Sequence, residues 1–325
     1  MSALRSLSLV GPLLACVGVL GCITINLPTG QLEPLVESVV GGSGAAKVLM
    51  VEVDGLITES SQEADFFGTI EEGMVSRVRE ELDRAREDDQ IKALVLRINS
   101  PGGTVTGSDL LRHEILRFKR ERGVPVVAQL MGVAASGGYY VAVAADEIVA
   151  QPTTITGSIG VIFSGFNLSG LMEKLGIEDQ TLKTGAFKDA GSMTRPMRPE
   201  EREQLQSVID DFHARFVEVV SKGRKNLPAE QVRSLADGRI FSANQALEAG
   251  LVDRIGSVDG TIAGARRLAG LESATVVTYH RPREHAENYY TRNPGRREPL
   301  VDLWPDALAL DGPAFLYLWV PGTIR

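Results

Sequence analysis

Cysteine is almost absent from this chain, since its two cysteines, Cys16 and Cys22, both lie within the first 22 of 325 residues. The remainder therefore has no thiol for a disulfide, a cysteine nucleophile or a thiolate-bound metal. Histidine is also scarce, and none of the four histidines is paired at a spacing that would ligate a metal on one helix face. We expect no metal and no cofactor.

Basic clusters are missing as well. The formal net charge is −8, and lysine and arginine are dispersed along the chain. A nucleic-acid partner is not expected, because such binding needs a basic patch. The hydrophobic content of 43% is enough for one large domain or two smaller domains, each with a proper core.

A long uncharged run extends from Leu7 to Leu27, behind a short N-terminus with one positive charge. Its length suits a hydrocarbon core of ~30 Å. The pattern is typical of an export signal or signal anchor, and it predicts that the following chain faces out of the cytoplasm. "VLGC", residues 19–22, resembles a bacterial lipobox that would be lipidated at Cys22; the alternative is an uncleaved helix. We assign residues 1–28 to this membrane segment.

Three further segments follow from composition and periodicity. Residues 29–46 are glycine-rich and are predicted to be a flexible linker. In residues 47–280, strand-like runs alternate with amphipathic helical runs, and "IEDQTLKTG" (177–185) is predicted to be one of the strands. The alternation predicts an α/β fold with a parallel sheet and a helical C-terminal part. Residues 281–325 are predicted to be a partly disordered tail, in which "AFLYLWV" needs a partner surface or packs back on its own domain.

Two of the expected strands end in glycines. Gly102 and Gly103 follow "LVLRINSP", and Ser136 with Gly137 follows "VVAQLMGVAA". Ligands of α/β proteins bind at such strand ends. Glycines let the backbone approach a ligand, and N–H groups near a helix start can face an oxyanion. A serine at a strand-to-helix turn has the geometry of an acyl-transfer nucleophile, although serine is also a common helix N-cap.

A serine nucleophile needs a base. His113 lies in a charged helical run, and none of the histidines lies in a glycine-bounded loop. A lysine kept neutral by burial is another solution. Lys183 and Lys188, both in "KTGAFKDAGSMTRPM", are equal candidates from the residues alone.

Three blocks of this sequence resemble the S49 family of signal peptide peptidases in its short, single-domain bacterial form. They are "RINSPGGTVTGSDLL", "MGVAASGGYYVAVAADEIVAQPTTITGSIGVI" and "KTGAFKDAGSMTRPM", in the order and spacing of that family. The resemblance covers about residues 47–270 and implies a ClpP/crotonase-like fold. "GSMTRPM" departs from the family's commoner "GSPFRPM".

The resemblance also implies a Ser–Lys dyad in which Ser136 is the nucleophile and Lys188, not the other lysine, is the general base. Gly103 would supply an oxyanion N–H, with Gly137 as a possible second donor. Ser158, in "TGSIG", matches the hydroxyl that orients the lysine; the alternative is that it only forms a turn.

Family members form homo-oligomeric rings in which the serine and lysine of one site come from neighbouring subunits, so the two can be far apart within one chain. The implied activity is a serine endopeptidase that hydrolyses remnant signal peptides at the bacterial membrane, outside the cytoplasm. Two alternatives use the same sequence features: a catalytically silent, membrane-tethered oligomeric scaffold that binds peptides, and a crotonase-type acyl-CoA enzyme that needs neither residue of the dyad.

Overall fold

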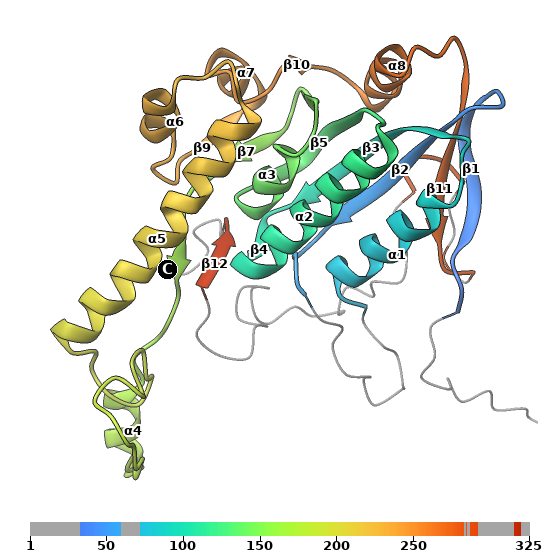
Figure 1. Ribbon diagram of the computed structural model, residues 1–325. Coiled ribbons are helices and arrows are strands. Elements are labelled where there is room, and N and C mark those ends of the chain that lie inside the picture. The colour runs from blue at the N-terminus through green and yellow to red at the C-terminus, as the bar shows by residue number, and fades with distance from the viewer. Residues whose placement is uncertain (1–32, 60–71, 283, 285–286, 292–314, 320–325) are drawn as a thin grey trace, which may run out of the picture.

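The computed structural model describes residues 33–59, 72–282, 284, 287–291 and 315–319 (Figure 1). The predicted membrane segment 1–28, with Cys22, lies outside these ranges. No helix within the described ranges combines the length and the apolar character needed to cross a bilayer.

The main sheet is built from parallel strands. From β11 through β2, β3, β5 and β6 to β10 each neighbouring pair runs parallel, and β1 adds an antiparallel edge to β11. The predicted α/β fold with a parallel sheet is therefore confirmed. The strands are β1 (Val36–Ser43), β2 (Lys47–Asp54), β3 (Ile91–Ser100), β5 (Val126–Ala135), β6 (Glu147–Ala150), β10 (Arg254–Ile255) and β11 (Ala274–His280).

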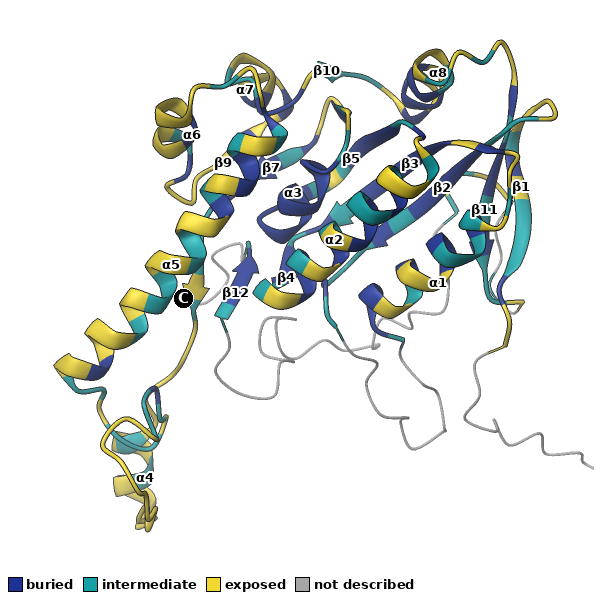
Figure 2. Cartoon of the chain, in the orientation of Figure 1, coloured by how far each residue is buried: buried dark blue, intermediate teal, exposed yellow. Residues whose placement is uncertain are grey.

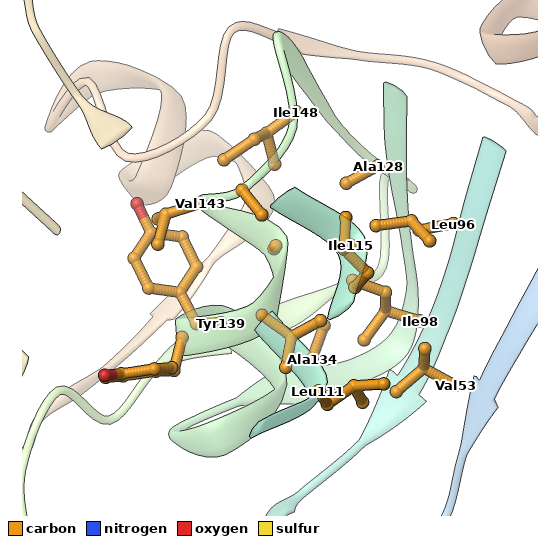
Figure 3. Close-up of a cluster of buried hydrophobic side chains, with 14 of the residues drawn as sticks. Val53, Leu96, Ile98, Leu111, Ile115, Ala128, Ala134, Tyr139, Val143 and Ile148 are labelled. Carbon is orange, nitrogen blue, oxygen red and sulfur yellow. The ribbon is translucent and has the colours of Figure 1, made fainter. Parts of the chain in front are cut away.

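Helices cover both faces of this sheet, because alternate side chains of the strands point to opposite faces. In β2, Leu49 and Val51 belong to the core beneath the helices of one face, whereas Val48 and Met50 belong to the core on the other. Figure 3 shows the first core, where Ile115 lies toward Leu96 and Leu111 lies toward Val53. The first face carries α1 (Met74–Arg86), α2 (Val105–Arg122) and α3 (Gly137–Ala142), and the second carries α8 (Val258–Leu268).

The C-terminal part is helical, as predicted. The long helix α5 (Pro199–Gly223) extends beyond the body of the domain, and the segment that contains α4 (Ser169–Leu175) lies at its far end (Figure 1). Two short helices follow, α6 (Ala229–Leu235) and α7 (Ala243–Glu248). Between them β9 (Ile240–Ser242) pairs with β7 (Ile155–Gly157), which in turn continues the sheet beside β5.

Two predictions of local structure are wrong. Residues 36–43 were predicted to belong to a linker but form β1, because β11 offers them a partner edge and Val40 is buried against the sheet. The glycines there serve the turn into β2: Gly42 has a φ of 67°, and an added Cβ would lie 2.3 Å from the Ala274 carbonyl oxygen. Residues 177–185 were predicted to be a strand but form none, and Leu182 is 97% exposed.

The apolar stretch of the C-terminal tail packs on its own domain. Its residues form β12 (Phe315–Leu318), the middle strand of a second, three-stranded sheet. The outer strands are β4 (Gly102–Thr104) and β8 (Ile162–Phe163). Of the two expectations for this stretch, packing back on the domain is the one confirmed.

Candidate active site

Ser136 lies on a sharp turn between β5 and α3. Its φ of 52° and ψ of −116° lie in a region that costs a non-glycine residue about 1–3 kcal/mol. Two backbone hydrogen bonds hold the turn: Ser136 N–H donates to the Gly157 carbonyl at 2.8 Å, and Tyr140 N–H donates to the Ser136 carbonyl at 2.8 Å. The strained serine is thus fixed at the carboxyl edge of the parallel sheet, where such folds bind ligands.

The hydroxyl of Ser136 has no role in holding the helix. It makes no side-chain cap, so the alternative interpretation as a simple N-cap is wrong. Its Oγ is buried and has no hydrogen-bond partner among the residues that the structure describes. The nearby buried hydroxyl of Ser100, in contrast, donates to the Gly55 carbonyl at 2.6 Å and accepts from Gly102 N–H at 3.1 Å. Leaving a buried hydroxyl unpaired costs about 1–3 kcal/mol, so the Ser136 hydroxyl destabilises the folded chain where that of Ser100 does not.

The backbone of β4 directs one N–H toward the site. Ile57 N–H donates to the Gly102 carbonyl at 2.9 Å, and Thr104 N–H donates to the Ile57 carbonyl at 3.0 Å. Successive residues of a strand point their N–H and C=O groups to opposite sides, so Gly103 N–H points away from Ile57. Glycine is required here, because a Cβ on Gly103 would lie 2.0 Å from the Ile57 carbonyl oxygen.

The two glycine-rich strand ends pack against each other. A Cβ on Gly102 would lie 2.8 Å from the Gly137 nitrogen, and a Cβ on Gly137 would lie 2.4 Å from Ser108 Oγ. Neither position leaves room for a side chain. The fold therefore brings Ser136, Gly103 and Gly137 together, and such an arrangement can offer backbone N–H groups to the oxyanion of an acyl-transfer reaction.

Ser158 lies beside this turn, at the end of the neighbouring strand. β7 pairs with β5 so that Gly157 is opposite Ala135. Ser158 has a φ of 49°, and it and Ser136 are the two non-glycine residues with positive φ in the described part of the chain. Its side chain lines an open pocket of about 370 Å³, together with His213 and Leu318.

His213 is not presented as a base for the serine. Its Nε2 lies 2.7 Å from the Ala236 carbonyl oxygen, which occupies that ring nitrogen. The neutral ring would have to donate through Nε2 to make this bond. This contact agrees with the sequence-based expectation that a histidine does not serve here.

The two candidate lysines have different environments. Lys183 Nζ forms an ion pair with Asp189 at 2.6 Å. The Asp189 carboxylate therefore already engages the Lys183 amine within the same segment. Lys188 is exposed in the turn 186–190, which we call the lysine turn, and its ammonium group contacts no acidic or polar partner within the described ranges.

Arg195 holds the lysine turn against the start of α5. It donates through Nε to Asp189 Oδ2 at 2.8 Å and through Nη1 to Glu201 Oε2 at 2.9 Å. The hydrogen bond from Arg195 is the main reason that the pKa of Asp189 lies far below its usual range, and it also lowers the pKa of Glu201 to about 2. All three groups are therefore charged at neutral pH.

A single chain does not bring Lys188 to Ser136. The segment between α4 and α5, which includes the lysine turn, lies beyond the far end of α5, whereas α3 lies against the main sheet (Figure 1). Of the predicted site residues, the structure brings together Ser136, Gly103, Gly137 and Ser158 and leaves Lys188 apart.

Sequence analysis missed the residues of the tail that reach this site. Tyr317 of β12 is fully buried and packs on Tyr140 of α3 and Phe216 of α5. The available signal was the isolated apolar stretch in a polar tail, which indicated a contact but not its location.

Comparisons with known proteins agree with these features. Residues 118–272 match the model of Peptidase family S49, and residues 59–155 match the Clp protease model. A protein of Enterococcus faecium whose name includes "signal peptide peptidase SppA" is 38% identical over 250 residues, 77% of this chain and 72% of that protein. A protein of Synechocystis sp. named as a protease is 44% identical over 190 residues, which cover 58% of this chain and 68% of that protein. Another protein named as a protease, from Methanocaldococcus jannaschii, is 34% identical over 247 residues, which cover 74% of this chain and 75% of that protein.

Proposed function

Because this chain belongs to peptidase family S49 and is a serine peptidase of the SppA type, we propose that it hydrolyses peptides with a Ser136–Lys188 dyad shared between neighbouring subunits. The observation that carries the proposal is the Ser136 hydroxyl, which is buried on a strained turn and lacks a partner among the described residues. A lysine from a second copy would supply that partner.

The reaction would be acyl transfer. Neutral Lys188 accepts the hydroxyl proton as Ser136 Oγ bonds to the carbonyl carbon of the peptide. The oxyanion accepts a hydrogen bond from Gly103 N–H, with Gly137 N–H as a second donor; each such donor is worth about 2.7–4 kcal/mol. The C–N bond then breaks, and the leaving amine takes the proton from the lysine. Water, deprotonated by the same lysine, hydrolyses the acyl-enzyme.

The surface around the lysine turn supports a subunit contact. Figure 2 shows the α4 segment largely exposed. It carries many large apolar side chains in contact with solvent, which on a monomer mark an interaction site. A contact between this face and a different face of the next copy is head-to-tail, and such contacts form a ring when the rotation from copy to copy closes. The exposed apolar residues of the segment are Phe166, Leu168, Leu171, Leu175, Ile177, Leu182, Phe187 and Met193.

The open pocket beside Ser158 is the proposed entry for the lysine of the next subunit. Ser158 lines it directly, and its hydroxyl would accept or donate a hydrogen bond to orient the incoming amine. The pocket is about 370 Å³, ample for a lysine side chain. Burial there would remove the ammonium group from water and lower its pKa, as a general base requires.

The substrate class and location rest on sequence. The apolar run from Leu7 to Leu27 supports attachment to a bacterial membrane with the peptidase domain outside the cytoplasm. We propose remnant signal peptides and other membrane-associated peptides as substrates, in line with the name of the Enterococcus relative.

The test is complementation between two inactive variants. Ser136→Ala and Lys188→Ala are each purified and assayed, then co-expressed and assayed again. If the dyad is shared between subunits, each variant alone is inactive and the mixed oligomer regains about a quarter of the sites, because half of the serines meet an intact lysine on half of the occasions.

The control is Lys183→Ala, which should keep full activity. Full activity in either single variant of the dyad would overturn the Ser–Lys mechanism. Inactive single variants whose mixture stays inactive, despite proven co-assembly, would overturn the sharing of the dyad. An intact oligomer of the wild type without turnover, or without a fluorophosphonate adduct on Ser136, would favour the silent scaffold.

A further inference from the structure

The tail strand β12 fills a gap one strand wide beside Ser136. It runs antiparallel to β4 on one side, with Tyr317 opposite Gly103, and antiparallel to β8 on the other, with Leu316 opposite Ile162. Neighbouring strands lie about 4.7–4.9 Å apart, so without β12 the edges of β4 and β8 would be separated by the width of one extended peptide. Adding a strand to such open edges is a common way for proteins to bind extended peptides.

The main chain of β12 lies where a substrate's reacting carbonyl would lie. Trp319 N–H donates to the Pro101 carbonyl at 2.8 Å. Hydrogen-bonded pairs alternate along an antiparallel ladder, so Tyr317 and Gly103, two residues farther on, also form a hydrogen-bonding pair. The Tyr317 carbonyl oxygen therefore faces Gly103 N–H. The same oxygen would be 1.9 Å from a Cβ on Gly102 and 3.0 Å from one on Gly137.

The side chain of Tyr317 fills an aromatic pocket. Its ring stacks on Tyr140 with centroids 5.1 Å apart and packs on Phe216 at 4.6 Å. Its hydroxyl donates to the Phe212 carbonyl at 2.8 Å. The ring is fully buried, so the pocket matches a large aromatic side chain and not a small one.

A second aromatic side chain of β12, that of Phe315, lies next to Tyr317 on the same face of the strand. Phe315 and Tyr317 point to the same side, since alternate residues of a strand share a face. The Phe315 ring lies 5.1 Å from that of Phe163 and 5.5 Å from that of Phe212. The strand is thus held by backbone pairing on both edges and by two neighbouring aromatic contacts.

We propose that residues 315–319 are an internal substrate mimic: they occupy the peptide groove, close Ser136 off from substrates, and mark the Tyr140–Phe216 pocket as selective for an aromatic residue before the scissile bond. The inference rests on the proposed role of Ser136. A peptide substrate must displace β12 before it can reach the serine, and peptides with an aromatic residue at this position compete best.

The first measurement is the rate at which a fluorophosphonate labels Ser136, located by mass spectrometry, in the full-length chain. Tyr317→Ala should label about 100-fold faster than the wild type, because truncating a buried aromatic ring shifts an open–closed equilibrium by two decades or more. Tyr317→Phe keeps the stacked ring and loses one hydrogen bond, so its rate should rise less than about 10-fold. A folded Tyr317→Ala variant that labels at the wild-type rate would overturn the proposal.

The second measurement adds the strand back. The synthetic peptide PAFLYLW, the sequence of residues 313–319, should slow the labelling of Tyr317→Ala, whereas PAFLALW should not. Among coumarin amide substrates, those with phenylalanine or tyrosine before the amide should be cleaved faster than those with alanine. Equal effects of the two peptides would contradict the aromatic pocket.

A third measurement separates this inference from the catalytic proposal. Fluorescein-labelled PAFLYLW should bind the Tyr317→Ala, Ser136→Ala double variant more tightly than it binds Ser136→Ala alone, as measured by anisotropy. Ser136 unlabelled in every variant, together with this binding difference, would refute the nucleophile and retain the groove. Ser136 labelled equally in every variant, without the binding difference, would retain the nucleophile and refute the substrate mimic.

Discussion

Replacing Ser136 with glycine should make the protein more stable while abolishing its activity. The residue has two unfavourable features at once: a φ of 52° with a ψ of −116°, and a buried hydroxyl without a partner among the described residues. Glycine adopts such backbone angles without steric cost and removes the hydroxyl. Alanine removes only the hydroxyl, so comparing the two variants separates backbone strain from the buried polar group.

The magnitudes can be estimated for each feature. Relief of the backbone strain contributes about 1–3 kcal/mol. Removal of an unpaired buried hydroxyl contributes about 1–3 kcal/mol. The greater freedom of glycine in the unfolded chain opposes these by about 0.5–1 kcal/mol. Ser136→Gly should therefore raise the free energy of unfolding by about 1–5 kcal/mol, and Ser136→Ala by about 1–3 kcal/mol.

The assay is urea denaturation of both variants in a Lys188→Ala background, so that no lysine from a neighbouring subunit can pair with the hydroxyl. Ser100→Ala is the matched control. Ser100 is also buried at this site, but its hydroxyl makes two hydrogen bonds, so its removal should lower stability by about 1–3 kcal/mol.

Two results would refute the reasoning. A Ser136→Gly variant less stable than Ser136→Ala would show that the turn is not strained in the way that its angles imply. Loss of stability in both variants, as in the Ser100→Ala control, would show that the Ser136 hydroxyl is well satisfied in the folded chain.

Three further predictions concern other contacts. Arg195→Ala should release the lysine turn and lower kcat about 10- to 100-fold with little change in KM, as misplacement of a catalytic group does, while Ser136 labelling persists; a change in KM alone would contradict this positioning role. The hydrogen bond from Arg195 lowers the pKa of Glu201 to about 2. The stabilisation that ionised Glu201 contributes is therefore complete above the unfolded pKa near 4.5 and is lost as the pH falls toward 2. In urea titrations, the difference in the free energy of unfolding between wild type and Glu201→Gln should therefore shrink between pH 5 and pH 3. Gly157→Ala should lower stability by about 1–3 kcal/mol more than Gly176→Ala, since both have positive φ but a Cβ on Gly157 would lie 2.4 Å from the Phe241 ring and one on Gly176 meets nothing within 4 Å; equal losses in urea would refute the clash.

Local patterns in the sequence were sufficient for the main architecture. The amphipathic helical runs predicted within residues 47–280 include α1 and α2, and Gly123 ends α2 in a left-handed conformation, as a helix-terminating glycine does. The two glycine-rich breaks were identified as strand ends, and both lie at the carboxyl edge of the sheet. These features depend on residues close together in the chain, which is why periodicity and turn chemistry predict them.

Strand assignment failed where pairing decides structure. Residues 36–43 contain the glycines of a linker, yet they form a strand because β11, far along the chain, offers them an edge. Residues 177–185 look like a strand, yet they pair with no strand of the described chain, and their segment lies beyond the far end of α5 (Figure 1). A strand is stable only with a neighbour, and the sequence of the strand itself does not contain that neighbour.

The sequence by itself determined that glycines and a serine follow two strands of an alternating α/β pattern. That alternation places both strand ends at one edge of a parallel sheet. Only the tertiary structure decided that the Ser136 hydroxyl is left without a partner in the described chain, that Lys183 rather than Lys188 is ion-paired, and that Tyr317 lies against Gly103. Each of these depends on which atoms meet across long separations in the chain, and that is set by packing of the whole fold rather than by any local preference.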